Sequence, residues 1–129
     1  MIEELAETII RVLKSQGVII QRYDAITTNS IYLKLDYGVA KTIRISDHRG
    51  KKHLKYRYNL QSNLTKKKFA NKGSRLYYHP DEVYIMIRRI LKDRAELMKR
   101  YGNKYQYFMD KNIAENAYRR GFWREAKLV

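Results

Sequence analysis

The residues best suited to chemistry are gathered in one short tract, residues 43–52, which reads Ile-Arg-Ile-Ser-Asp-His-Arg-Gly-Lys-Lys. It places one acid, one histidine and four cations between two predicted strands. Arginine can hold two phosphate oxygens at once and lysine acts as a point charge, so this composition suits a phosphate group. The tract predicts contact with a nucleic-acid backbone or docking on a nucleoprotein. The alternative is a solvated hairpin in which Ser46 and Asp47 only bond their own turn.

Asp47 and His48 also suggest catalysis, because a histidine beside a carboxylate can act as a general base. Neighbouring residues on a strand point to opposite faces, however, so adjacency in the sequence does not make a catalytic dyad. A metal-dependent nuclease needs two or more carboxylates around its metal ion, and residues 41–79 contain only Asp47. The histidines lack zinc-site spacing. We therefore expect no enzyme, metal or cofactor, and keep a small metal-dependent nuclease as an alternative.

Two further groups of side chains suit a polyanionic partner. Residues 62–79 form a polar connection rich in lysine, which is too long for a simple turn. The chain also has 12 tyrosines, several of which alternate with cations, and such a mixture suits unpaired bases. Alternation with Leu54 and Leu60 places Tyr56 and Tyr58 on the core face. The freer tyrosine candidates are Tyr77, Tyr78, Tyr105 and Tyr107.

The predicted binding residues are cations, one histidine and two tyrosines from the middle of the chain. They are Arg44, His48, Arg49, Lys51, Lys52, Lys55, Arg57, Lys66, Lys67, Lys68, Lys72, Arg75, Tyr77 and Tyr78. A set of helical cations is instead expected to form a solvated face. These are Arg88, Arg89, Lys92, Lys99 and Arg100.

The distribution of charge supports this choice. The chain has 28 Lys and Arg against 13 Asp and Glu, a formal net charge of +15. Residues 41–79 hold 12 of these cations and one acid, a net of +11, whereas residues 1–40 have a net of −1. Self-repulsion of this size destabilises a compact state, which favours a polyanionic partner such as RNA or DNA. A basic protein kept soluble by its charge is the alternative.

Length and composition limit the fold. The 129 residues suit one domain, in which 102–129 could form a C-terminal helical appendage. The absence of cysteine excludes disulfides, and no apolar run approaches the roughly 18 residues of a membrane span. The acidic N-terminus lacks a signal-peptide core, so a cytoplasmic protein without a membrane partner is expected.

Hydrophobic periodicity predicts an α+β fold. Helices are expected over 2–16, 80–101 and 110–120, and strands over 18–23, 31–36, 42–46 and 54–61. We expect an antiparallel sheet of three or four strands, with helices on one face and the other face free to bind. Lys34, Arg44, Lys55 and Arg57 would share that solvent face. Phe122 and Trp123 would pack back on the domain.

Two local patterns resemble known proteins. The element order is similar to that of double-stranded RNA-binding domains, although the basic cluster lies upstream of the last helix. The Ile43-Arg44-Ile45-Ser46-Asp47-His48 box, which follows Ser30-Ile31-Tyr32-Leu33 after a hairpin, resembles a box in small phage and prophage proteins. Some of those are anti-CRISPR inhibitors of Cas9. The resemblance implies a phage-encoded anti-CRISPR that inhibits an RNA-guided nuclease in the cytoplasm of the bacterial host. The basic surface indicates that it would bind guide RNA or the guide-loaded complex. A phage accessory protein with mainly phosphate contacts is the alternative.

Overall fold

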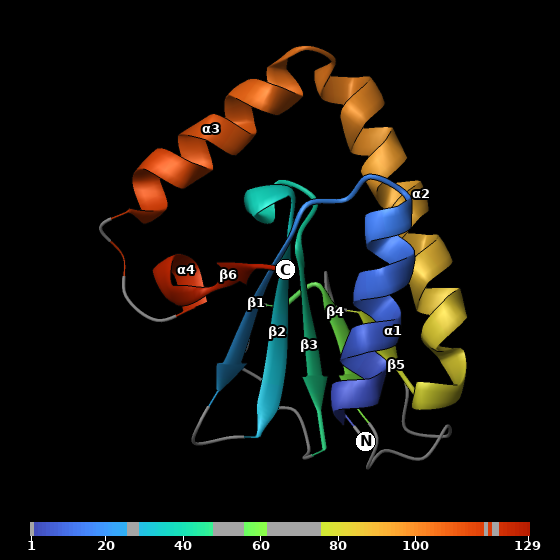
Figure 1. The fold of residues 1–129 in the computed structure, drawn as a ribbon. Coiled ribbons are helices and arrows are strands. Elements are labelled where there is room, and N and C mark those ends of the chain that lie inside the picture. Colours follow the sequence, from blue (N-terminus) through green and yellow to red (C-terminus); the bar gives the residue numbers. More distant parts are fainter. Residues whose placement is uncertain (1, 26–28, 48–55, 62–75, 118, 120–121) are drawn as a thin grey trace.

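A computed structural model of the chain describes residues 2–25, 29–47, 56–61, 76–117, 119 and 122–129, without the side chains of 122 and 123. The fold is α+β, as the periodicity predicts, with a sheet of six strands (Figure 1). The helices are α1 (Ile2–Ser15), α2 (Val83–Tyr101), α3 (Lys104–Asn116) and α4 (Phe122–Glu125), with short 3-10 turns η1 (Asp36–Gly38) and η3 (Pro80–Glu82). The strands are β1 (Ile20–Ala25), β2 (Ser30–Leu35), β3 (Thr42–Ser46), β4 (Tyr58–Gln61), β5 (Leu76–Tyr78) and β6 (Lys127–Leu128).

The sheet is mixed, in the order β5-β4-β3-β2-β1-β6. β1, β2 and β3 form the expected antiparallel meander, but β4 is parallel to β3 and β5 is parallel to β4. The prediction of a purely antiparallel sheet is therefore wrong. Parallel strands need a connection of about a dozen residues, and residues 47–57 and 62–75 supply that length. β5 lies where only a polar connection was expected, and β6 is antiparallel to β1 at the other edge.

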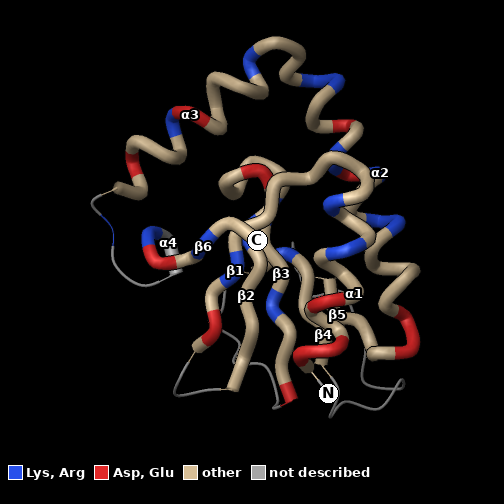
Figure 2. Tube along the Cα trace, viewed as in Figure 1, with Lys and Arg blue, Asp and Glu red and all other residues tan. Residues whose placement is uncertain are grey.

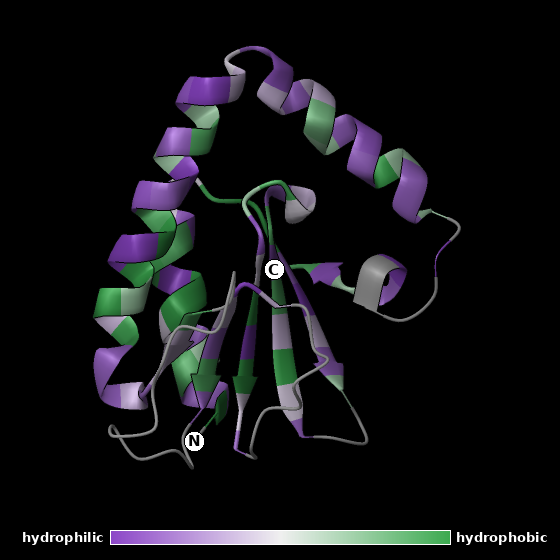
Figure 3. Cartoon of the chain, turned by 180° about the vertical axis from the view of Figure 1, so that it is seen from behind, coloured by the Kyte–Doolittle hydropathy of each residue, from purple (hydrophilic) through white to green (hydrophobic). Residues whose placement is uncertain are grey.

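The apolar core lies on one face of the sheet, beneath α1 and α2 (Figure 1). Alternate strand residues point into it, since successive side chains of a strand face opposite ways. Leu33 and Ile45 on this face are both 0% exposed. The helices bury Ile2, Ala6, Ile9 and Leu13 of α1, and Val83, Met86, Ile87 and Ile90 of α2. Viewed from behind, the strands lie in front of α1 and α2 and show hydrophilic residues among the hydrophobic ones (Figure 3).

The helix boundaries follow local chemistry. Gly17 ends α1 with a φ of 85°, a left-handed conformation that glycine adopts at little cost. The expected helix start at Pro80 is a 3-10 turn, in which the Glu82 carboxylate accepts from the backbone N–H of His79 at 3.0 Å. Gly102 ends α2 as expected, and α3 begins at Lys104 rather than at Asp110. In the described part of the chain, no helix combines the length and the apolar character of a membrane span.

Candidate nucleic-acid interface

Only four of the predicted binding residues belong to the described part of the chain. Arg44, Arg57, Tyr77 and Tyr78 are placed. The others lie outside the described residues, and these are His48, Arg49, Lys51, Lys52, Lys55, Lys66, Lys67, Lys68, Lys72 and Arg75. The four placed residues do not form one group. Arg44 lies in the middle of the sheet, whereas Arg57, Tyr77 and Tyr78 lie at the β4–β5 edge.

The predicted solvent face of the sheet is buried. Lys34 and Arg44 point away from the helices, as their alternation requires, yet each is only 1% exposed. Arg44 pairs with Tyr32 on β2 and with Asn59 on β4, in a polar row that crosses the sheet. Burial lowers the pKa of the Lys34 ammonium. The expectation that this face is free to bind through Lys34 and Arg44 is therefore wrong, because a period of two fixes the face and not its exposure.

Tyr56 packs on the same polar face, contrary to the expectation that it joins the core. Its ring lies 4.7 Å from that of Tyr32, between centroids, in a small cluster with Ala126. Burial, with a smaller contribution from Tyr32, raises the pKa of Tyr56 to about 12. Strand β4 begins only at Tyr58, so the alternation that correctly buries Tyr58 does not extend back to Tyr56.

A second polar group lies where β4, β5 and α2 meet, and we call Arg57, Tyr58, Tyr78, Arg89 and Asp93 the β4–β5–α2 corner. The hydroxyl of Tyr58 donates to Asp93 Oδ2 at 2.5 Å. Arg89 Nε lies 3.2 Å from Asp93 Oδ1, and the Arg89 side chain is 46% exposed. The Arg57 guanidinium carbon lies 5.9 Å from the centre of the Tyr58 ring, within the range of a cation–π contact. In the corner, Arg89 thus pairs with Asp93, while Arg57 lies against the ring of Tyr58.

The charges of the corner act on its tyrosines. Burial is the main cause of the raised pKa of Tyr58, and the hydrogen bond to Asp93 adds to it. The pKa of Tyr78 is also raised, first by burial, while Arg89 and Arg57 act in the opposite direction. Tyr78 and Arg57 remain partly exposed. Two predicted binding residues therefore lie together with Arg89, which the sequence had assigned to a solvated face.

The two basic segments of the sequence are anchored at neighbouring strand ends. Ser46, at the end of β3, pairs with Gln61 at the end of β4. Where the chain returns, the backbone N–H of Leu76 donates to the carbonyl of Arg57 at 2.7 Å. Residues 48–55 contain four Lys and Arg and residues 62–75 contain five, and neither segment contains an acid. The two segments together contain nine Lys and Arg, and each joins two strands that are neighbours in the sheet.

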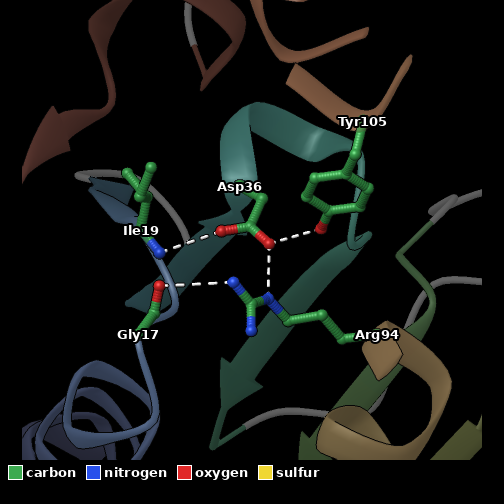
Figure 4. Close-up of polar contacts among 5 residues, drawn as sticks. All are labelled: Gly17, Ile19, Asp36, Arg94 and Tyr105. Carbon is green, nitrogen blue, oxygen red and sulfur yellow. Dashed lines mark hydrogen bonds and ion pairs between the residues drawn. The ribbon is translucent and has the colours of Figure 1, made fainter. Parts of the chain in front are cut away.

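A buried carboxylate directly after β2 was not predicted. Asp36 is 0% exposed and accepts hydrogen bonds from three directions (Figure 4). Arg94 Nε donates to it at 2.5 Å, the backbone N–H of Ile19 donates at 2.9 Å, and the hydroxyl of Tyr105 donates as well. Arg94 also donates to the carbonyl of Gly17 at 3.2 Å. Tyr105 is 5% exposed, so its assignment as a freer tyrosine is wrong, whereas Tyr107 is 60% exposed.

The residues of the nuclease alternative are only partly placed. Asp47 follows β3 and is exposed, while His48 lies outside the described residues. Within the described ranges, no group of three or more His, Asp or Glu side chains is arranged to hold a metal ion.

No protein-family model, curated protein sequence or solved structure matches the chain. The box that resembles phage proteins can still be located in the fold. Its first four residues, Ile43 to Ser46, are β3, in which Ile43, Ile45 and Ser46 are each 0% exposed. Packing of a central strand therefore accounts for most of the box.

Proposed function

We propose that this chain binds the phosphate backbone of a nucleic acid, through the two basic segments and the β4–β5–α2 corner. The observation that carries the proposal is that the acid-free segments 48–55 and 62–75 are followed by Arg57 and Leu76, which are hydrogen-bonded to each other at the start of β4 and β5. All 13 acids lie outside these segments. Several of them are held by cations of the folded body, as Asp36 is by Arg94 and Asp93 is by Arg89.

Phosphate contact explains the use of so much positive charge. Each phosphate that a lysine or arginine neutralises releases condensed counterions, which makes binding favourable and strongly dependent on salt. Contacts of this kind position a protein on a nucleic acid without reading its sequence. Binding by the basic segments would therefore be tight at low salt and weakly sequence-specific.

Inhibition of an RNA-guided nuclease such as Cas9 is the more specific form of this proposal. It rests on the resemblance of the Ile43 to His48 box and on charge, since a guide-loaded effector exposes RNA phosphate. An inhibitor that mimics DNA would be acidic, and this chain is not. The proposed inhibitor would therefore bind guide RNA or the guide-loaded complex. A phage accessory protein that binds free nucleic acid is the second form.

Salt titration with matched variants tests the phosphate-binding proposal. The triple variant Lys66→Gln/Lys67→Gln/Lys68→Gln removes three charges from one basic segment. The control Lys104→Gln/Lys111→Gln/Lys127→Gln removes three exposed charges from α3 and β6. For a duplex, the slope of log K against log salt should become shallower by about 0.9 per lost contact in the first variant. An unchanged slope in that variant, or equal changes in both, would refute the proposal.

Cleavage assays separate the two forms. The chain is titrated into guide-loaded Cas9 with target DNA, and binding to the bare DNA is measured in parallel. Loss of cleavage near one equivalent, below the concentration that coats the DNA, supports the inhibitor. Loss only when the DNA is coated favours the accessory protein. Cleavage of bare nucleic acid that requires a divalent metal would instead identify a nuclease.

A further inference from the structure

The outer face of α2 has a line of side chains that neither the core nor the proposed site uses. Arg88, Lys92 and Lys99 lie on this face, and all three are exposed. Tyr84, one turn before Arg88, is 56% exposed. The spacing of four, four and seven residues keeps these positions on one side of an α-helix. We call them the α2 strip, and Figure 2 shows Lys and Arg recurring along this helix.

We infer that the α2 strip is a rigid contact surface for the phosphates of a double-stranded nucleic acid. The inference rests on the proposed function and extends it to residues that the sequence assigned to solvent. Arg89, one residue from Arg88, belongs to the β4–β5–α2 corner, so the strip begins beside the proposed site. With a rise of about 1.5 Å per residue, Tyr84 to Lys99 spans about 22 Å. The strip therefore extends the binding surface well beyond the corner.

Within the described residues, the cations of the α2 strip are not neutralised by ion pairs. Arg88, Lys92 and Lys99 make no ion pair with any residue that the structure describes, whereas Arg89 is held by Asp93. Glu96 is the one acid on the exposed side of α2, and Arg100 adds a further cation beside it. A helix face with this excess of unneutralised cations is complementary to a polyanion.

The shape of the strip favours a duplex over a single strand. Binding of single strands without sequence preference relies on successive aromatic side chains on which bases stack. The strip offers one aromatic ring, Tyr84, followed by cations and the small residue Ala95. α2 also packs its opposite side in the core through Met86 and Ile90, so it cannot move to follow a flexible strand. Cations spaced along one side of a helix that is packed on the core suit the regularly spaced phosphates of a duplex.

The test compares the triple variant Arg88→Gln/Lys92→Gln/Lys99→Gln with the α3 and β6 control Lys104→Gln/Lys111→Gln/Lys127→Gln. Glutamine has nearly the same helix propensity as lysine and arginine, so α2 should remain folded, which circular dichroism checks. The probes are a duplex of about 20 base pairs and a single strand of equal length, between about 50 and 200 mM salt. We expect the α2 variant to lose about 2 to 3 units of the salt slope on the duplex. The control should lose less than about 1 unit, the value of a single contact.

Failure of this inference is distinguishable from failure of the proposed function. If the wild-type chain binds the duplex, and the Lys66→Gln/Lys67→Gln/Lys68→Gln variant binds it more weakly and with a shallower salt slope, the proposed function stands. An unchanged slope in the α2 variant would then overturn the α2 strip alone. An equal loss on the single strand and the duplex would also overturn it. If the wild-type chain binds neither probe, both proposals fall.

Discussion

Two parts of the molecule use the same three side-chain types and place them in different surroundings. Asp36 accepts from Arg94 and Tyr105, and its side chain is 1% exposed. Asp93 accepts from Arg89 and Tyr58, and its side chain is 23% exposed. In both groups the arginine comes from α2. The first group is enclosed by the end of β2 and the start of α3, and the second lies where β4, β5 and α2 meet, with Arg89 46% exposed.

The difference in exposure gives the two ion pairs different roles. The pair of Asp36 with Arg94 stabilises the fold, whereas the pair of Asp93 with Arg89 can be reached from solvent. A buried carboxylate has lost its water, so removing its arginine leaves a charge with too few partners. An exposed pair is screened by solvent and contributes little to stability. Arg94 therefore serves to hold α2, α3 and the α1–β1 junction together, whereas under the proposed function Arg89 would exchange Asp93 for a phosphate at small cost. The following variants test this contrast.

The largest effect is expected for Arg94→Met. This change keeps a long side chain but leaves the Asp36 carboxylate buried without its cation, which typically costs about 3 to 5 kcal/mol. Urea denaturation measures the loss in the free energy of unfolding. Arg88→Met, on the exposed side of the same helix, is the control and should change stability by less than about 0.5 kcal/mol. Similar losses in the two variants would contradict the structural role of Arg94.

Removing the hydroxyl of Tyr105 should reduce stability more than removing the hydroxyl of Tyr58. Tyr105→Phe removes one of three donors from the buried Asp36, where water does not replace it, and a lost hydrogen bond to a charged group costs about 1.5 to 3 kcal/mol. Tyr58→Phe removes the hydroxyl that meets Asp93, which keeps Arg89 and access to water, so we expect about 0.5 to 1.5 kcal/mol. Both substitutions retain the ring. A larger loss for Tyr58→Phe in denaturant titrations would reverse the ranking of the two sites.

Alkaline pH should destabilise the chain through these tyrosines. Burial is the main cause of the raised pKa of Tyr105, and the hydrogen bond to Asp36 adds to it. Above the ordinary tyrosine pKa of about 10, the unfolded chain loses this proton while the folded chain keeps it, so stability falls as pH rises. The Tyr105→Phe variant should show a shallower fall than the wild type above pH of about 10. Parallel stability curves for the two proteins would contradict this.

The smallest stability effect is expected for Arg89→Gln. The pair with Asp93 is partly exposed, so its loss should cost at most about 1 kcal/mol, and salt should reduce the difference further. Its effect on nucleic-acid binding should be larger than its effect on folding. Thermal melts at low and high salt give the first quantity, and duplex binding gives the second. A loss of stability that salt does not change would place Arg89 with Arg94 as a buried structural cation.

The sequence predicted the elements better than their connections. Strict alternation in β2 and β3 reveals which residues face the core, and glycine at 17 and 102 marks helix ends, because these signals are local. The parallel pairing of β3, β4 and β5 depends on contacts between distant residues, which periodicity does not encode. A three-residue strand such as β5 is also too short to show a period.

The candidate site was predicted in part. The charge distribution pointed to the basic segments, whereas it could not reveal that Arg44 is buried or that Arg89 joins the β4–β5–α2 corner. One feature of the sequence could have indicated the buried carboxylate: Asp36 is a single acid directly after the largely apolar strand β2. Its partners Arg94 and Tyr105 lie 58 and 69 residues away, so only the folded chain brings them together.

The pairing of β1 with β6 has a consequence for the order of folding. Gln21 Nε2 donates to the carbonyl of Ala126, 105 residues further along the chain, and Val129 donates its backbone N–H to Ile20. The β1–β2 hairpin can close once the chain has been made as far as Leu35. Closing so long a loop is entropically costly and slow unless the intervening chain is already compact. The β1 edge should therefore be completed late, on a scaffold formed by the meander and α2.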